Sequence, residues 1–458
     1  MIKRRQFIQG ALLASAALNT KNIMGASRSP FGKLKNDPNK ILDLPEGFEY
    51  SIISEQGTIM SDGLKTPAQA DGMAAFKGSN GNINLVLNHE NHPASFKNSP
   101  FGTNNEYLGT INLDHIYDQG NGSTPGTGGT TTIEYDPLTK QTKSQHLSLM
   151  GTEYNCAGGP TPWGSWLSCE ECFSSPGTTF ERNTIVTREK RHGYIFEVNA
   201  NDKNATKPIP LKEMGRFEHE AAAIDPISGT IYLTEDKHRS LLYRFIPNIP
   251  GQLSLGGKLQ ALGIAKKNSF DTRNWNDLAI RENEWHEAKW IDMDNVDSDE
   301  NDLRLRGFES GAARFARGEG ICYAENSIFL TATIGGVERM GQVFEYRINR
   351  EFSKSAQGVA GHIKLLAESN TESTLQHADN IIMSPWGDLI ICEDSNNYCG
   401  LVGISPSGKQ YVFADNTHSD SELCGVCFSP DGQLMFVNIQ NRGLTLAING
   451  PWSRVNNL

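Results

Sequence analysis

The sequence has 458 residues, a formal net charge of −11 and 37% hydrophobic residues, with 45 glycines and 20 prolines. This composition favours many short strands and tight turns over a helical bundle. Because no Lys- or Arg-rich run follows the N-terminus, the sequence excludes a basic surface for nucleic acids. An acidic protein also repels anions at long range, so any phosphate site would need local arginine or metal charge.

Residues 1–27 are predicted to be a twin-arginine signal peptide. The pattern KRRQF begins at Lys3, the apolar stretch 8–18 is too short to span a bilayer, and small residues around Ala26 suit cleavage. We expect the twin-arginine export machinery to recognise this segment and residues 28–458 to form one domain that is periplasmic or secreted. This route exports folded proteins, which suits a metal loaded in the cytoplasm. No later apolar run approaches the ~20 residues of a membrane helix, so no stable membrane insertion is expected.

The eight cysteines include two CxxC pairs, Cys169/Cys172 and Cys424/Cys427. The two pairs are too far apart along the chain for a zinc ribbon. Both lie in apolar, strand-like segments, which predicts buried thiols or a disulfide.

Six segments share one local pattern: an apolar run, a turn containing Pro or Gly, and a second apolar run. Each predicts a β-hairpin. The segments are residues 73–90, 156–171, 220–236, 319–333, 379–394 and 424–440. A hairpin repeated about six times predicts an all-β fold, a roughly six-bladed β-propeller. The irregular spacing predicts long inter-strand insertions, such as the Gly/Ser/Thr-rich residues 120–132 and the acidic residues 292–302.

Possible metal ligands, most of them acidic, recur at both ends of these hairpins. The opening positions include Cys156, Glu220, Glu319 and Asp379, and the closing positions include Glu90, Glu170, Glu171, Glu235, Asp236, Glu393 and Asp394. In a propeller the innermost strands run along the central axis, so equivalent positions converge at one end of the channel. Ionised carboxylates gathered in a low-dielectric channel need cations, which predicts bound metal. The alternative is that these acids cap strands at a wet rim.

The kinds of ligand indicate the kinds of metal. Carboxylate and amide oxygens favour calcium, whereas one thiolate, from Cys156 in a glycine-lined turn, indicates a transition metal such as iron. Arg317 lies two residues before Glu319, and residues two apart in an extended segment face the same side. Its guanidinium is therefore expected at the metal cluster, where its planar fork suits a phosphate. The alternatives are a free or disulfide-bonded Cys156 and a surface salt bridge for Arg317.

These residues carry a resemblance to the PhoX-type alkaline phosphatases, a family of exported propeller phosphomonoesterases. Its most specific parts are NCAGGPTPWG from Asn155 and ARFARGEG from Ala313. Together with the leader, the matching segments are residues 85–90, 155–171, 216–247, 311–320, 379–394 and 421–440. One departure is Gln376-His377-Ala378 before Asp379, where the family pattern has a more Pro-containing lead-in.

The resemblance implies two ferric ions and several calcium ions at one end of the channel. It implies that Arg317 holds the substrate phosphate and that Cys156, Glu220 and Glu319 bind iron, which makes these four the catalytic set. The remaining candidates, for calcium or for positions behind the ligands, are Glu90, Glu170, Glu171, Asp379, Glu393 and Asp394.

The implied reaction is hydrolysis of small phosphomonoesters by a monomeric enzyme, with a metal-bound oxo or hydroxo group as the nucleophile. His89 and His219 neighbour the proposed acids but are expected to pack on the opposite face of their strands. Two other functions stay open at this point. One is a calcium-dependent propeller hydrolase such as a lactonase, which would have no use for Cys156 or Arg317. The other is a non-catalytic propeller whose metals are structural.

Overall fold

The computed structural model describes residues 29–351, 359–395 and 399–452, so the signal peptide predicted over residues 1–27 lies outside the described residues. Strands dominate this part of the chain, which contains a single α-helix, α1 (Leu303–Glu309). Within the same residues, no helix has both the length and the apolar character needed to cross a membrane. All eight cysteines are buried free thiols, which agrees with one of the two predicted states.

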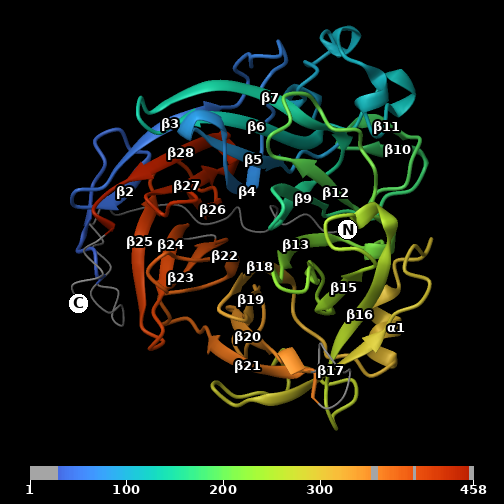
Figure 1. The fold of residues 1–458 in the computed structure, drawn as a ribbon, viewed down its shortest axis with the longest axis vertical. Coiled ribbons are helices and arrows are strands. Elements are labelled where there is room, and N and C mark those ends of the chain that lie inside the picture. Colours follow the sequence, from blue (N-terminus) through green and yellow to red (C-terminus); the bar gives the residue numbers. More distant parts are fainter. Residues whose placement is uncertain (1–28, 352–358, 396–398, 453–458) are drawn as a thin grey trace, which may run out of the picture.

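Six inner strands surround a central axis (Figure 1). They are β4 (Ala70–Lys77), β8 (Asn155–Pro160), β13 (His219–Ile224), β18 (Gly318–Ala324), β22 (Ala378–Met383) and β26 (Leu423–Phe428). Each packs against the next along the chain, and β26 packs against β4, so the ring is closed. The predicted all-β propeller is therefore confirmed.

Each inner strand pairs antiparallel with the next strand along the chain, as the six predicted hairpins require. The partners are β5 (Ile83–His89), β9 (Ser165–Glu170), β14 (Ile231–Glu235), β19 (Ser327–Ala332), β23 (Leu389–Glu393) and β27 (Leu434–Ile439). Further strands extend the sheets outward: β6 (Gly128–Asp136), β7 (Gln141–Thr152), β12 (Ile195–Asn199), β15 (Tyr243–Pro247), β16 (Gly257–Ile264), β20 (Gln342–Ile348), β21 (Gly361–Glu368), β24 (Gly400–Ile404), β25 (Gln410–Asn416) and β28 (Leu444–Asn449). Apolar side chains fill the space between neighbouring sheets, and Leu262, Leu330 and Phe344 share one buried cluster.

The sheets do not correspond one to one with the hairpins. β17 (His286–Asp292) pairs with both β16 and β21 and thereby joins two blades into one nine-stranded sheet. β10 (Gly177–Glu181) and β11 (Thr184–Arg188) form a separate two-stranded sheet. β3 (Glu49–Glu55) pairs with β28, while β1 (Leu34–Lys35) and β2 (Leu42–Pro45) extend the sheet of β22. Strands from the two ends of the chain thus share sheets and close the ring.

A shift in pairing register interrupts every inner strand near its beginning. It falls between Ala70 and Met73, Asn155 and Gly158, His219 and Ala222, Gly318 and Ile321, Ala378 and Ile381, and Cys424 and Cys427. Such β-bulges bend a strand and redirect a side chain. Five of the six bulges contain a metal-ligand type of residue, namely Asp71, Cys156, Glu220, Glu319 and Asp379. The bulges therefore mark the end of the channel where these side chains meet.

Candidate metal centre and active site

Two sets of equivalent positions supply the side chains at this end of the channel. The first set lies in the bulges of the inner strands. The second set is the residue immediately after each partner strand: Glu90, Glu171, Asp236, Thr333, Asp394 and Gln440. Since both sets belong to the same ends of neighbouring hairpins, the fold brings residues more than 300 positions apart into contact. One example is the Gln440 amide, which donates to Asp71 over 2.9 Å and to Glu90 over 2.8 Å.

Among the described residues, four groups of side chains present ligand atoms that lie within 4.8 Å of one another, and one of them, Glu153–Cys172–His192, shares no residue with the rest. The other three are Cys156–Glu171–Glu220, Glu220–Glu319–Asp379 and Asp379–Asp394–Glu422. Glu220 belongs to the first two of these three groups and Asp379 to the last two, so the three groups form one continuous chain. Of the three residues predicted to share a focus, Cys156 and Glu319 each share a group with Glu220 but not with each other.

The charges in this chain of groups fit multivalent cations. Burial, followed by the neighbouring carboxylates, raises the pKa of Glu220, Asp379 and Glu422 well above the usual range. The same two causes raise the pKa of Glu171 to about 8, although a hydrogen bond with Asp236 opposes them. Burial, and then Glu220, also raises the pKa of the Cys156 thiol. Buried acids that repel one another ionise together when cations balance them, and the donor set suits metal ions for this task.

Arg317 lies beside the same carboxylates with 9% of its surface exposed. Its Nε donates to Asp236 Oδ1 over 2.5 Å, its Nη2 donates to Asp236 Oδ2, and Nη2 lies 2.7 Å from Glu319 Oε1. The predicted proximity to Glu319 is thus present, but the cause differs from the one expected. Arg317 has φ of 56°, in the left-handed region rather than in an extended strand. Its backbone is fixed on both sides, since its N–H donates to Lys237 O over 2.8 Å and its carbonyl accepts from Thr333 N over 3.1 Å.

Two predicted ligands, Glu170 and Glu393, have other partners. Glu170 Oε1 lies 2.7 Å from Nδ1 of the buried His192, and its Oε2 accepts from the Gly193 backbone over 2.9 Å. Glu393 accepts from the Gln376 backbone over 2.7 Å, and burial raises its pKa to about 8. Consecutive residues at a strand end face opposite sides, so Glu171 and Asp394 reach the cluster while their neighbours point away from it.

Two acids of the cluster region, Asp71 and Glu422, were not among the predicted ligands. Asp71 is buried, and its pKa is raised by burial and then by Glu90. A sequence signal for it exists, because Asp71-Gly72 matches Glu319-Gly320 in the hairpin repeat. The first hairpin was predicted to begin two residues too late, at Met73. Glu422 immediately precedes its inner strand, as Glu218 precedes β13, but the other four hairpins have no acid at this position, so the repeat carries only a weak signal for it.

His89 and His219 face away from the cluster, as predicted. His89 lies 3.0 Å from both Ala68 O and Thr131 Oγ1, and His219 Nε2 lies 3.0 Å from Gly215 O. Burial lowers the pKa of His89 to about 4 and that of His219 to about 3, so both rings are neutral at neutral pH.

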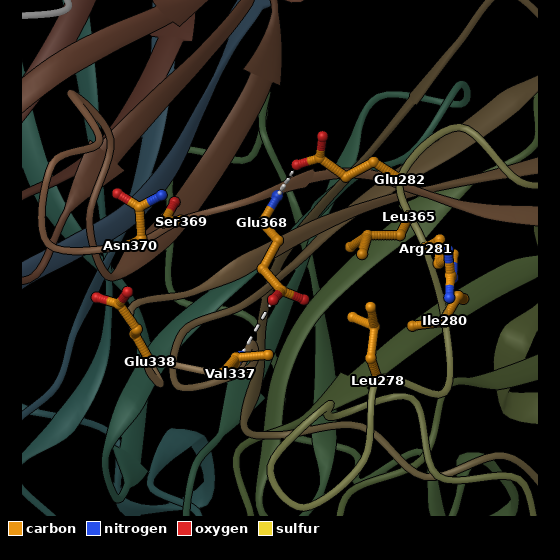
Figure 2. Close-up of a pocket in the computed structure, with 10 residues that line it drawn as sticks. All are labelled: Leu278, Ile280, Arg281, Glu282, Val337, Glu338, Leu365, Glu368, Ser369 and Asn370. Atoms are coloured by element: carbon orange, nitrogen blue, oxygen red, sulfur yellow. Dashed lines mark hydrogen bonds between the residues drawn. The ribbon is translucent and has the colours of Figure 1, made fainter.

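A separate cavity of about 410 Å³ lies at the outer part of the β18–β21 blade (Figure 2). Its walls combine apolar side chains with Arg281, Glu282, Glu338 and Glu368. Glu282 accepts from the Glu368 backbone over 2.7 Å, and Glu368 accepts from the Val337 backbone over 3.0 Å. Three carboxylates and one guanidinium give the lining of this cavity a net negative charge, which disfavours an anionic ligand.

Comparisons with known proteins agree with the geometry. The family model described as alkaline phosphatase PhoX matches residues 29–135 and 123–443. Among solved structures, Pseudomonas fluorescens PhoX in complex with vanadate, a transition state analogue, is 17% identical, with 93% of this chain and 98% of that chain covered and a TM-score of 0.67. A gluconolactonase from Xanthomonas campestris is 10% identical, with coverage of 88% and 98% and a TM-score of 0.38. No curated protein sequence matches significantly. The chain therefore belongs to the alkaline phosphatase PhoX family and is a metal-dependent phosphatase that hydrolyses phosphomonoesters.

Proposed function

We propose that two ferric ions and several calcium ions bind the axial cluster and that phosphomonoesters are hydrolysed where this cluster meets Arg317. The observation that carries the proposal is the continuous chain of three ligand groups, which are linked by Glu220 and Asp379 and have a buried arginine beside Glu319 of the middle group. Cys156, Glu220, Glu319 and Arg317 would form the catalytic set.

The composition of each group supports a division of the metals. Cys156–Glu171–Glu220 contains a thiol, which suits ferric iron better than calcium. Glu220–Glu319–Asp379 shares Glu220 with it and would hold the second iron. Asp379–Asp394–Glu422 offers only oxygen and suits calcium. Asp71 and Glu90, bridged by the Gln440 amide, supply a further all-oxygen position for calcium.

When bound, these ions would neutralise the negative charge of the phosphate oxygens and lower the pKa of water. Arg317 would hold the phosphate at a fixed position beside the cluster. Asp236 and Glu319 engage Nε and Nη2, and among the described residues no hydrogen bond forms to Nη1. That N–H group would donate to a phosphate oxygen as charge develops on it. Since His89 and His219 are neutral and bonded elsewhere, proton transfer does not involve them.

We also propose that residues 28–458 act as one exported, monomeric domain, delivered to the periplasm or secreted by the twin-arginine machinery after residues 1–27 are recognised. Support comes from the burial of the ligand groups in a ring closed by both chain ends. Ions in such a site are most readily loaded during folding, and this export route transports folded chains.

The test is elemental analysis of protein exported by its own twin-arginine pathway, combined with a Cys156→Ser variant. We expect iron and calcium in the wild type and release of phosphate from a chromogenic phosphomonoester at alkaline pH. Cys156→Ser should lose iron, retain calcium and lose activity by more than about 100-fold, because losing a direct ligand should cost more than the roughly 10- to 100-fold of losing a residue behind a ligand. Cys427→Ser is the matched control, because Cys427 is equally buried but belongs to none of the ligand groups found among the described residues. Wild-type protein with neither metal, or a Cys156→Ser variant with full activity, would contradict the proposal.

A further inference from the structure

The loop after β14, the loop after β19 and the segment that contains Trp275 meet beside Arg317. The Arg317 N–H donates to Lys237 O over 2.8 Å, and Thr333 N donates to Arg317 O over 3.1 Å. Trp275 Nε1 donates to Ile334 O over 2.8 Å. Both Arg317 and Trp275 are therefore fastened to the loop that follows β19.

The loop that follows β14 is fastened to the same place. Arg273 donates from Nη1 to His238 O over 3.0 Å, and its guanidinium lies 4.1 Å from the ring centroid of Trp275. The guanidinium of Arg339 lies 4.6 Å from the same centroid. A tryptophan with two arginines thus lies next to the residue that would hold the substrate phosphate. We name Arg239, Arg273, Trp275 and Arg339 the arginine rim.

Positive charge exceeds negative charge at the arginine rim. Asp271 accepts from Arg273 over 2.8 Å and 2.6 Å and also lies 3.9 Å from Arg314, so one carboxylate serves two guanidinium groups. Arg239 and Arg339 are exposed, and neither forms an ion pair within the part of the chain that the structure describes.

One charge of each sign lies nearby, and of these only the lysine is neutralised by an ion pair among the described residues. Lys237 pairs with Glu218 over 2.8 Å, and Glu338 accepts from the Thr371 backbone over 2.9 Å. The protein as a whole has a net charge of −11 and repels anions. The local excess of arginine beside Arg317 instead attracts them.

Resting on the function proposed above, we propose that the arginine rim binds a second anionic group, carried by the leaving group of the phosphomonoester. The preferred substrates are then small phosphorylated acids or bisphosphates rather than esters of neutral alcohols. Guanidinium forks match carboxylate and phosphate oxygens, which makes arginine suited to this recognition. The cavity of Figure 2, with three glutamates and one arginine in its lining, suits a second anionic group less well than the arginine rim does.

The experiment compares two substrates of almost equal size, 3-phosphoglycerate and glycerol 3-phosphate, which differ in a carboxylate. The measured quantity is the ratio of their kcat/KM values in the metal-loaded enzyme. We expect Arg339→Gln to lower this ratio by about two- to fivefold, the effect of removing one exposed ionic contact, and Arg239→Gln/Arg339→Gln to lower it further. Added salt should reduce the wild-type ratio more than that of the double variant.

Arg347→Gln is the matched control, because Arg347 also stacks on a tryptophan, Trp285, at 4.5 Å but lies toward the other end of β20 from the Arg339 loop. It removes the same charge and should leave the ratio unchanged. Equal ratios in the wild type and the double variant, at equal melting temperatures, would overturn the arginine rim as a subsite. A metal-loaded wild type that hydrolyses neither ester would instead overturn the proposed function.

Discussion

Asp236 is the residue on which the position of Arg317 depends. It accepts from two nitrogens of the guanidinium, one of them over 2.5 Å. We expect Asp236→Asn to lower kcat/KM for a phosphomonoester by about tenfold or more, because a hydrogen bond to a charged group contributes about 1.5–3 kcal/mol. Iron and calcium contents should stay at wild-type values, and Asp236→Glu should restore part of the activity.

The control for this substitution is Asp225→Asn. Asp225 is also buried and also pairs with an arginine, Arg350, but at the opposite end of β13. Its loss should lower the melting temperature and leave kcat/KM unchanged. If Asp236→Asn instead released metal, Asp236 would be a ligand rather than a positioning residue.

At the residue scale, the hairpin repeat predicts those site residues that occupy equivalent positions in several hairpins. Cys156, Glu220, Glu319 and Asp379 open hairpins, and they meet as expected. Sequence could not separate Glu170 from Glu171 or Glu393 from Asp394, because the choice depends on where each strand ends. The repeat identifies Asp236 as an acid at the closing end of its hairpin. Its pairing with Arg317 depends on the left-handed backbone of Arg317, which no local sequence pattern predicts.

At the element scale, the bulges explain the small residues that follow the ligands. A Cβ on Gly320 would lie 2.6 Å from Asp379 O and 2.7 Å from Asn380 Cα, both backbone atoms of the neighbouring inner strand. We expect Gly320→Ala to lower the free energy of unfolding by about 1–3 kcal/mol through overpacking and to lower metal content as well. Urea unfolding and elemental analysis measure the two effects.

Gly109→Ala is the control, because a Cβ there would meet nothing within 4 Å. If Gly320→Ala kept both stability and metal, close packing of the inner strands would not be what positions the ligands.

A buried charge cluster joins β9, β11 and the segment between β11 and β12. His192 lies 2.7 Å from Glu170 and 3.2 Å from Asp118, and Arg188 pairs with Glu153 over 2.7 Å. Burial lowers the pKa of His192, but Glu153 and Glu170 outweigh it and raise this pKa to about 10. A raised folded-state pKa contributes stability that is complete below the unfolded value, about 6.5, and is lost as pH rises through about 10.

Urea unfolding between about pH 7 and about pH 10 should therefore show the wild type losing stability. His192→Gln should be less stable at neutral pH and should show a shallower decline. Equal slopes for the two proteins would mean that His192 is not charged in the folded state.

Sequence predicted the six hairpins because each is local, with its two strands and turn contiguous in the chain. It did not predict pairings between distant strands, such as β3 with β28 or β17 with both β16 and β21. These pairings depend on the closed ring and leave no local pattern. The sheet of β10 and β11 was likewise invisible, since its strands carry exposed residues such as Phe180 and Ile185.

At the scale of the whole molecule, ring closure and metal binding are coupled. The closed ring places the beginnings of its inner strands at one end of the axis, where buried carboxylates would repel one another without cations. Because a ligand that binds only the folded state stabilises it, each occupied site contributes about 3 kcal/mol at a free metal concentration a hundredfold above its Kd.

We therefore expect chelation to lower the melting temperature and abolish activity, whereas a salt control of equal ionic strength should do neither. Since every blade supplies an inner strand to the axis, amide hydrogen exchange should accelerate in β4, β8, β13, β18, β22 and β26 together. Acceleration confined to one blade would show that the metals stabilise a local site rather than the ring. In that case the carboxylates of the other blades would have to be held by their hydrogen bonds alone, as the amide of Gln440 holds Asp71 and Glu90.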